Sequence, residues 1–400
     1  HSICSANAPA AIMSPTKIPS QTTSERHMTQ KTGLIWNERF MWHDNGSALG
    51  QIPAGGAFQP GVHLENPETK RRLKNLLDAY DVTPQLSRLA HTAATRQTLE
   101  RFHTADYIDL VAHMSQTTGG SVGQSTIAGP GSYDIARLAV GGTTAAIKDV
   151  MSGAVSNAYA LTRPPGHHAE RDRGRGFCIF NNIALAILEA RALGWVDRVA
   201  VVDWDVHHGN GTQQAFFEDP NVLTISIHQE MLYPVNLGKL EETGEGDGDG
   251  FNLNIPLPAG CGGGAYLKTI DAVVAPALNA FKPDLIIVAC GFDAAYFDPL
   301  SHMLLVANHY RVMTEKMMAL AADLCGGRLI TNHEGGYSDF YVPLCGMAVI
   351  ETLSGLTSGV VDPYAGTEFV ANQDLMPHQA ARIDEAIQGP LAKFLRRAAT

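Results

Sequence analysis

The chain has few charged residues, no dense run of Lys or Arg, and no apolar stretch long enough to cross a membrane. Charged residues make up only 17% of its 400 residues, and the formal net charge is −11. Phosphate binding needs clustered positive charge, so we expect no nucleic-acid partner. A helical membrane span needs roughly 18 consecutive apolar residues, and because no such run occurs we expect no membrane segment.

Paired cysteine motifs are also missing. The six cysteines are scattered and none belongs to a CxxC pair: Cys4, Cys178, Cys261, Cys290, Cys325 and Cys345. Most lie in apolar surroundings, which is typical of buried thiols in a reducing compartment rather than of a disulfide framework. We therefore predict a cytoplasmic protein. Cys178, in the run 176–182, is either a pocket neighbour or ordinary core packing.

Residues 1–33 lack the periodicity of the rest of the chain and are rich in Ser, Thr, Ala and Pro. His1 suggests a tag or processing remnant, and Met28 is a candidate natural start. The apolar stretch 6–13 is too short and lacks a basic flank, so it is a poor signal peptide. We assign 1–33 to a disordered or tag-like segment and 34–400 to one catalytic domain.

Strand-like apolar runs alternate with helix-like segments between about residues 33 and 365. We expect strands over 157–162, 199–202, 222–227, 285–289 and 328–331, and helices over 182–193, 265–281 and 309–324, the second interrupted at Pro276. The run 285–289 has no polar alternation, as in a sheet covered on both faces. This order predicts an α/β fold, a single domain with a mostly parallel sheet flanked by helices.

Polar clusters follow the ends of these expected strands. In chain order they begin at Arg163, Asp203, His228, Gly291 and His333. Open α/β sheets bind ligands in the crevice beyond the carboxyl ends of their strands, so the clusters should meet there. We therefore predict an active site at the C-terminal ends of the strands.

The sequence DWDVHHGNG at 203–211 is the strongest of these clusters. Side chains at i and i+2 share one face of a strand, so Asp203, Asp205 and His207 should point the same way. Asp205 and His207 are the first two candidate metal ligands, and Asp293 is the best third. Three protein ligands with an open position are typical of a catalytic zinc. The alternatives are a solvated turn for this cluster and a strand-end cap at Asp293.

His167 and His168 follow the turn Pro-Pro-Gly at 164–166. A tandem pair can supply a general base and a general acid beside a metal-activated water. Asp203 and Asn210 are the candidate hydrogen-bond partners that orient the two rings. An ionised Asp raises the pKa of its histidine and an Asn does so much less, so the two rings should differ in protonation.

Tyr337 follows two glycines, which allow its loop to approach the crevice closely. Its hydroxyl could hydrogen-bond a developing oxyanion, although a tyrosine packed in a turn is the alternative. Phe177 and Tyr233 are candidate walls of a substrate channel. Aromatic side chains often belong to the core, so this second interpretation stays open.

Five motifs together resemble the zinc-dependent histone deacetylase superfamily. They are RPPGHHA at 163–169, GFC at 176–178, DWDVHHGNG at 203–211, GFD at 291–293 and EGGY at 334–337. The resemblance spans about residues 33–359. The start of the first motif at Arg163 and the Asn210 of the third motif resemble the same motifs in class II members. The run 333–346 is especially similar to bacterial histone-deacetylase-like amidohydrolases.

The resemblance implies an arginase-like α/β fold and hydrolysis of a linear N-acyl amide. It assigns Zn²⁺ to Asp205, His207 and Asp293. It gives His167 and His168 roles on the water and the leaving amine, with His168 as the main acid/base, and it makes Tyr337 the residue that polarises the carbonyl. The implied substrate channel consists of Gly176, Phe177, Tyr233 and Leu300.

The resemblance also implies two structural K⁺ sites. One would use Asp203, Asp205, His207 and Ser226, largely through backbone oxygens, and the other would lie near Phe216, Asp219, Val222 and Phe251. Leu300 stands where the family has a channel-gating residue. A carboxylate there is associated with polyamine preference, so Leu argues against that preference. The segment 228–238 departs from the usual aromatic-Pro-Gly turn.

We therefore expect a zinc-dependent amidohydrolase acting on acyl-lysine or small acylated amines, assembled as a homo-oligomer (dimer or tetramer). Acetylpolyamines or small xenobiotic amides of the dimethoate type are the second choice of substrate. A non-catalytic acyl-binding scaffold is the rival outside enzymes, and the intact site residues argue against it. A manganese ureohydrolase is a further rival, but it needs more carboxylates to hold two metals.

Overall fold

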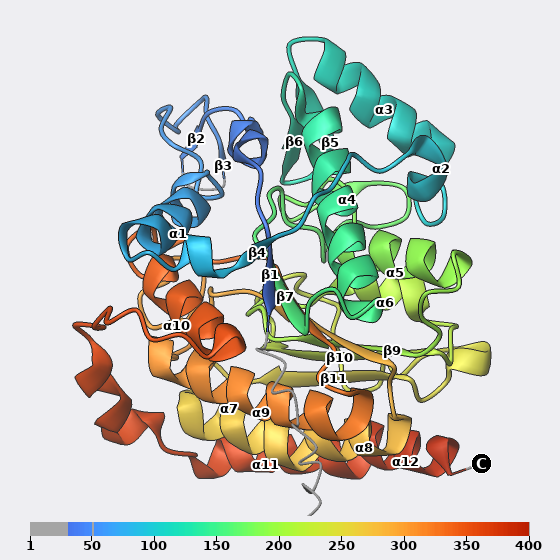
Figure 1. Ribbon diagram of the computed structural model, residues 1–400, viewed down its shortest axis with the longest axis vertical. Helices are drawn as coiled ribbons and strands as arrows, with labels where there is room; N and C mark the ends of the chain where they lie inside the picture. The colour runs from blue at the N-terminus through green and yellow to red at the C-terminus, as the bar shows by residue number, and fades with distance from the viewer. Residues whose placement is uncertain (1–30, 50–51, 400) are drawn as a thin grey trace, which may run out of the picture.

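A parallel sheet forms the centre of the computed structural model, which describes residues 31–49 and 52–399 (Figure 1). Within those residues eight strands form this sheet, and every neighbouring pair is parallel. The strands are β1 (Thr32–Ile35), β4 (Ser87–Arg88), β7 (Asn157–Ala160), β9 (Val199–Asp203), β10 (Val222–Gln229), β11 (Asn252–Leu257), β12 (Leu285–Cys290) and β13 (Leu329–His333). Their order in space is β11-β10-β9-β12-β13-β7-β1-β4.

Helices cover both faces of the sheet. The α-helices of the described residues are α1 (Glu68–Ala79), α2 (Arg96–Leu99), α3 (Ala105–Gln116), α4 (Ser132–Met151), α5 (Asn182–Ala192), α6 (Asn210–Phe216), α7 (Gly263–Thr269), α8 (Ala275–Phe281), α9 (Ala307–Cys325), α10 (Val342–Ser354), α11 (Pro377–Ala386) and α12 (Ala392–Ala398). In Figure 1, α4, α5 and α6 lie on one side of the sheet and α7, α8, α9, α11 and α12 on the other. The structure thereby confirms the predicted α/β fold.

The two-faced cover explains why the central strands carry uninterrupted apolar runs. Along β12, Ile286 and Val288 belong to the core cluster under α7 to α12, whereas Leu285 and Ile287 belong to the cluster under α4 and α5. Because successive side chains of a strand point to opposite faces, a strand buried on both faces needs apolar residues at every position.

Short strands lie outside the central sheet. β2 (Ala48–Leu49) pairs with β3 (Ile52–Pro53), and β5 (Gly120–Gln124) pairs with both β6 (Thr126–Ala128) and β8 (Gly174–Arg175). No helix in the described part of the chain is both long and apolar enough to span a bilayer. The five cysteines within that part are buried and unpaired.

Several element boundaries differ from the expectation. β1 begins at Thr32, so the ordered sheet starts before the proposed boundary at residue 33, and residues 1–30, with Cys4 and Met28, lie outside the described residues. β10 continues to Gln229 because its last residues pair with β11, so His228 lies within the strand and not after it. The expected break at Pro276 follows a π-helical turn, Ile270–Val274, between α7 and α8.

Candidate active site

The strand order brings the predicted site loops together. After β9 the chain builds β10 and β11 on one side and then returns to place β12 on the other side of β9. A parallel sheet opens a crevice at such a reversal of strand order. The loops after β9, β12, β13 and β7, which are consecutive in the sheet, carry Asp205, Asp293, Tyr337 and the tandem histidines.

Three buried side chains form a compact group at this crevice. The Nδ1 atom of His207 lies 3.2 Å from Oδ1 of Asp205 and 3.0 Å from Oδ2 of Asp293. The second oxygen of each carboxylate accepts a backbone hydrogen bond, from Gly335 to Asp205 and from Val206 to Asp293, both at 2.8 Å. Ligand atoms about 2.1 Å from a tetrahedral ion lie roughly 3.4 Å apart, so the separations of this nitrogen from Oδ1 of Asp205 and Oδ2 of Asp293 fit a zinc ion.

The reason for this convergence differs from the one expected. The strand ends at Asp203, so the alternation of a strand does not place Asp205 and His207. Instead, the backbone N–H of Asp205 donates to Oδ1 of Asp203 and that of His207 donates to Oδ1 of Asp205, both at 3.0 Å. Such aspartate turns are local, because each side chain bonds the backbone two residues on. As a result, the side chain of Asp203 contacts His167, whereas that of Asp205 contacts His207.

Gly335 is needed where the β13 loop passes the two carboxylates. A Cβ atom there would lie 2.3 Å from Oδ2 of Asp293 and 2.6 Å from Oδ2 of Asp205. Both distances are too short for any side chain. Glycine at 335 therefore allows the backbone to donate to Asp205, and the φ of +120° at Gly336 explains the second glycine before Tyr337.

The two histidines of the tandem pair have different partners. Nδ1 of His167 lies 2.9 Å from Oδ2 of Asp203, and Nδ1 of His168 lies 2.8 Å from Oδ1 of Asn210. Burial alone would lower the pKa of His167, but Asp205 and Asp203 outweigh it and raise the pKa to about 10. Burial, together with the positive charge of His167, lowers the pKa of His168 well below its usual value. The pKa values of the two rings are therefore shifted in opposite directions.

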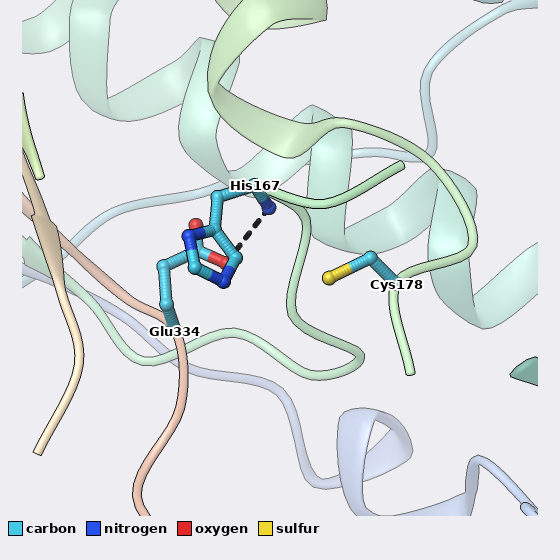
Figure 2. Close-up of side chains that lie close together, drawn as sticks. All are labelled: His167, Cys178 and Glu334. Carbon is cyan, nitrogen blue, oxygen red and sulfur yellow. Dashed lines mark hydrogen bonds between the residues drawn. The ribbon is translucent and has the colours of Figure 1, made fainter. Parts of the chain in front are cut away.

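A buried carboxylate holds the turn that carries these histidines. Oε2 of Glu334 accepts the backbone N–H groups of Gly166 (2.6 Å) and His167 (3.1 Å), the second of which is the dashed line in Figure 2. Its other oxygen accepts from the amide of Asn332 at 2.8 Å. Glu334 therefore fixes the position of the backbone that carries His167 and His168.

The thiol of Cys178 approaches the same place from the β8 loop (Figure 2). His167, Cys178 and Glu334 offer ligand atoms within 4.8 Å of one another, which makes them a second potential metal group. However, both oxygens of Glu334 already accept hydrogen bonds. Burial also raises the pKa of the Cys178 thiol, which donates to the Gly176 carbonyl at 3.4 Å. The trio therefore serves as packing around the histidine turn.

Arg163, just before the Pro-Pro-Gly turn, forms a buried ion pair that the sequence did not indicate. Its guanidinium donates to both oxygens of Glu65, at 2.7 and 3.0 Å, and to the carbonyl of His43 at 2.7 Å. The side chains are 1% and 3% exposed. The pair anchors the turn to the loop before α1, and Arg163 holds the pKa of Glu65 at about 2 despite its burial.

We predict that Glu65→Gln lowers the free energy of unfolding by about 3–5 kcal/mol, because it leaves a buried guanidinium unpaired. Urea denaturation followed by circular dichroism would measure the change. Glu68→Gln is the matched control, since Glu68 pairs with Arg71 and Arg72 at the surface, and its effect should stay below about 1 kcal/mol. Equal effects of the two substitutions would contradict the prediction.

A narrow cavity of about 110 Å³ opens beside the histidines. Its lining is His168, Gly176, Phe177, His207, Leu232, Tyr233, Leu300 and Tyr337. The structure thus brings the predicted channel residues to one place with Tyr337, and it adds Leu232. A larger groove of about 430 Å³ between the segment 90–95, α4 and α5 contains none of the predicted site residues.

The residues assigned to potassium are placed as follows. Oγ of Ser226 lies within hydrogen-bonding distance of Nδ1 of His208 (3.3 Å) and of His228 (2.9 Å). Asp219 pairs with Arg191 and accepts, through its carbonyl, the N–H of Val222. The carbonyl of Phe216 accepts the N–H of Asp219, and that of Phe251 accepts the N–H of Thr224. These contacts leave both potassium sites as predictions.

Four buried acids near the site were missed from the sequence, and one of them, Glu170, contacts Asn210. Glu65 and Glu334 are described above, and Asp298 accepts the backbone N–H of Tyr337 at 2.7 Å and that of Leu300 at 2.9 Å. Each of these last three acids accepts at least one hydrogen bond from a loop backbone or an arginine far away in the sequence, even though Asp298 also bonds the nearby Leu300. No local spacing signals such partners. The motif EGGY contains Glu334, but only its position among known motifs could have drawn attention to it.

Comparison with known proteins supports the same interpretation. The histone deacetylase domain profile matches residues 63–353. The chain is 48% identical to the histone deacetylase-like amidohydrolase of Pseudomonas aeruginosa over 84% of this chain and 89% of that protein. It is 34% identical to a probable deacetylase of Archaeoglobus fulgidus, over 81% and 86% of the two chains.

The fold agrees as well. The crystal structure of the HDA15 HD domain matches with a TM-score of 0.80 and 32% identity, covering 93% of this chain and 97% of that one. These similarities confirm the resemblance seen in the motifs. The chain therefore belongs to the family of histone deacetylases and deacetylase-like amidohydrolases.

Proposed function

We propose that the protein hydrolyses N-acyl amides with one Zn²⁺ held by Asp205, His207 and Asp293. The observation that carries this proposal is the convergence of one imidazole nitrogen and two carboxylate oxygens, with separations of 3.0 and 3.2 Å, at the wall of a narrow cavity. Buried carboxylate charges are costly unless they are compensated, and a bound zinc ion would compensate both of them. When bound, zinc would polarise the amide carbonyl and lower the pKa of a water molecule.

The surrounding residues would then divide the proton transfers. The pKa of His168 is lowered and its Nδ1 faces Asn210, so the ring would be neutral and its Nε2 would take a proton from the attacking water and return it to the leaving amine. His167, paired with Asp203, would stay protonated and add positive charge near the developing oxyanion. Burial and the charges of Asp293 and Asp205 raise the pKa of Tyr337, so its phenol would remain a hydrogen-bond donor.

The cavity limits the substrate to a slender group. Ligand pockets usually measure about 300–1,000 Å³, and this one measures about 110 Å³, so it would enclose only an unbranched acyl-amide segment. The walls include Phe177, Tyr233 and Leu300, which carry no charge. We infer that the substrate is an acyl-lysine peptide or a small acylated amine. Acetylpolyamines and small xenobiotic amides are the second choice, and the apolar Leu300 disfavours a polyamine.

Three further parts of the proposal do not depend on the geometry of the cavity. The homo-oligomer, the two K⁺ sites and the cytoplasmic location rest on the family resemblance and on the free thiols. The ureohydrolase rival is distinguished by metal content, because it requires two manganese ions per chain. The scaffold rival is distinguished by turnover.

A small panel of amides tests the function. The panel contains an acetyl-lysine peptide, a trifluoroacetyl-lysine peptide, acetylputrescine and a simple N-methyl amide, each with zinc-loaded protein. We expect a lysine amide to be hydrolysed with a kcat/KM roughly tenfold above that of acetylputrescine. A chelator should abolish turnover and added zinc should restore it. No turnover of any amide by protein that holds one zinc would favour the scaffold.

A further inference from the structure

Asn210 can face His168 in two ways, and the choice decides which nitrogen of His168 carries its proton. The amide group has an oxygen that accepts and an NH₂ that donates, and the two ends have nearly the same shape. If the oxygen faces the ring, Nδ1 must be protonated and Nε2 is the free base. If the NH₂ faces the ring, the proton moves to Nε2 and the ring cannot accept a proton there.

Glu170 removes this ambiguity. Nδ2 of Asn210 donates to Oε1 of Glu170 at 2.8 Å and to the carbonyl of His168 at 3.3 Å, and both of these partners are acceptors. The amide oxygen is therefore the atom left to face Nδ1 of His168, at 2.8 Å. His168, Asn210 and Glu170 are only 3–6% exposed, so bulk water does not compete for these hydrogen bonds.

The Glu170 carboxylate is itself held on two sides. Arg175 donates to the same oxygen, Oε1, and Arg173 lies 2.8 Å from Oε2 at the surface, where its side chain is 57% exposed. Arg175 also lies over the ring of Tyr233, with 5.7 Å from its Cζ to the ring centroid, and Tyr233 contacts His168 edge-on at 5.0 Å. The network thus closes around His168 and ties its orientation to the channel wall.

We propose that Glu170 is a positioning residue that, through the amide of Asn210, keeps the proton of His168 on Nδ1 and its Nε2 free to act as the base. This inference rests on the proposed function of His168. It predicts that the acceptor atom Oε1, rather than the charge, is what matters. Glu170→Met removes the acceptor at similar volume, whereas Glu170→Gln can keep an oxygen at the position of Oε1.

The kinetic test uses the zinc-loaded enzyme and its best amide substrate. Glu170→Met should lower kcat by about tenfold to a hundredfold, the factor expected from losing a hydrogen bond to a charged group, with KM changed less than about threefold. Glu170→Gln should recover most of the loss. Arg173→Met, which removes only the surface partner of the carboxylate, should behave as the wild type.

A second background separates positioning from loop stability. In Asn210→Asp both side-chain oxygens accept, so no flip is possible, and Glu170→Met should then cost less than about twofold or even raise kcat by relieving repulsion between carboxylates. If Glu170→Met lowers kcat by the same factor in both backgrounds, its role is structural and the proposal is wrong.

Ring ¹⁵N NMR of histidine-labelled, zinc-loaded protein gives a readout that does not depend on turnover. The resonances of His168 are assigned by their loss in His168→Asn. We expect a protonated Nδ1 and an unprotonated Nε2 in the wild type, and a mixture in Glu170→Met. A wild-type ring protonated at Nε2 would overturn the inference. The predicted tautomer in a protein that hydrolyses no amide would leave the inference standing and remove the proposed function.

Discussion

Replacing Tyr337 by Phe is expected to lower kcat by about 10²–10³-fold, with little change in KM or in stability. A donor placed where negative charge develops contributes mainly to the transition state, and removal of one such donor typically costs this factor. The phenol meets the requirement because burial and the nearby Asp293 and Asp205 keep its pKa well above 10. Steady-state kinetics on the best amide, together with a thermal melt, would measure both effects.

The structure indicates why Tyr337→Phe should remove the hydroxyl without disturbing the neighbouring contacts. The Tyr337 ring contacts Phe177 and His207 edge-on, at 5.8 and 6.4 Å between centroids, and Phe retains both contacts. The backbone N–H of Tyr337 donates to Asp298, so the loop is held without the hydroxyl. Only the donor of the proposed oxyanion contact is lost.

Tyr341→Phe is the matched control for this prediction. The Tyr341 hydroxyl accepts from the N–H of Ala307 at 3.1 Å and donates to Asp362 at 2.8 Å, and Tyr341 does not line the cavity. Its loss should cost about 1 kcal/mol of stability and leave kcat unchanged. If Tyr337→Phe retained more than about a third of kcat, the donor role would be excluded and the carbonyl would have to be polarised without it.

The sequence predicted the sheet because burial on both faces leaves a local signature. Residues 199–202 and 285–289 are apolar at every position, and β9 and β12 lie side by side in the middle of the sheet. The polar residues that follow them stood out because nothing in a core requires them. The candidate ligands Asp205, His207 and Asp293 could therefore be chosen before any contact was known.

What the sequence could not predict depends on contacts between distant segments. Along the chain, β10 and β11 lie between β9 and β12, so the adjacency of β9 and β12 in the sheet follows from the packing of the whole sheet. Arg163 and Glu65 are 98 positions apart, and Asn210 lies 40 positions from Glu170. Periodicity carries no information at such separations. The length of β10 was missed for the same reason, because only its pairing with β11 extends it to Gln229.

The second prediction with a large expected effect concerns zinc binding. Asp293→Asn should abolish both zinc binding and activity and should leave the fold of the zinc-free protein intact. Burial and the neighbouring Asp205 raise the pKa of Asp293 to about 6. An acid whose pKa is raised on folding destabilises the protein above its unfolded pKa of 3.8, with the full cost present above about pH 6. At pH 7.5 in a chelator, the neutral Asn removes this cost, but it also removes one of the two carboxylates that raise the pKa of His207 to about 10. The melting temperature of the variant should therefore stay close to that of the wild type.

Added zinc should raise the melting temperature of the wild type above that of Asp293→Asn. A ligand present at about 1,000 times its dissociation constant stabilises the folded state by about 4 kcal/mol, and the wild type should gain this increment whereas Asp293→Asn should not. Elemental analysis should find one zinc per wild-type chain and close to none in the variant. Asp298→Asn is the matched control, because Asp298 is also buried but bonds only loop N–H groups, so it should keep its zinc. An Asp293→Asn protein that retained zinc would move the third ligand elsewhere. A variant less stable than the wild type in chelator would show that the carboxylate stabilises the fold on its own, and the argument from buried like charges would then fail.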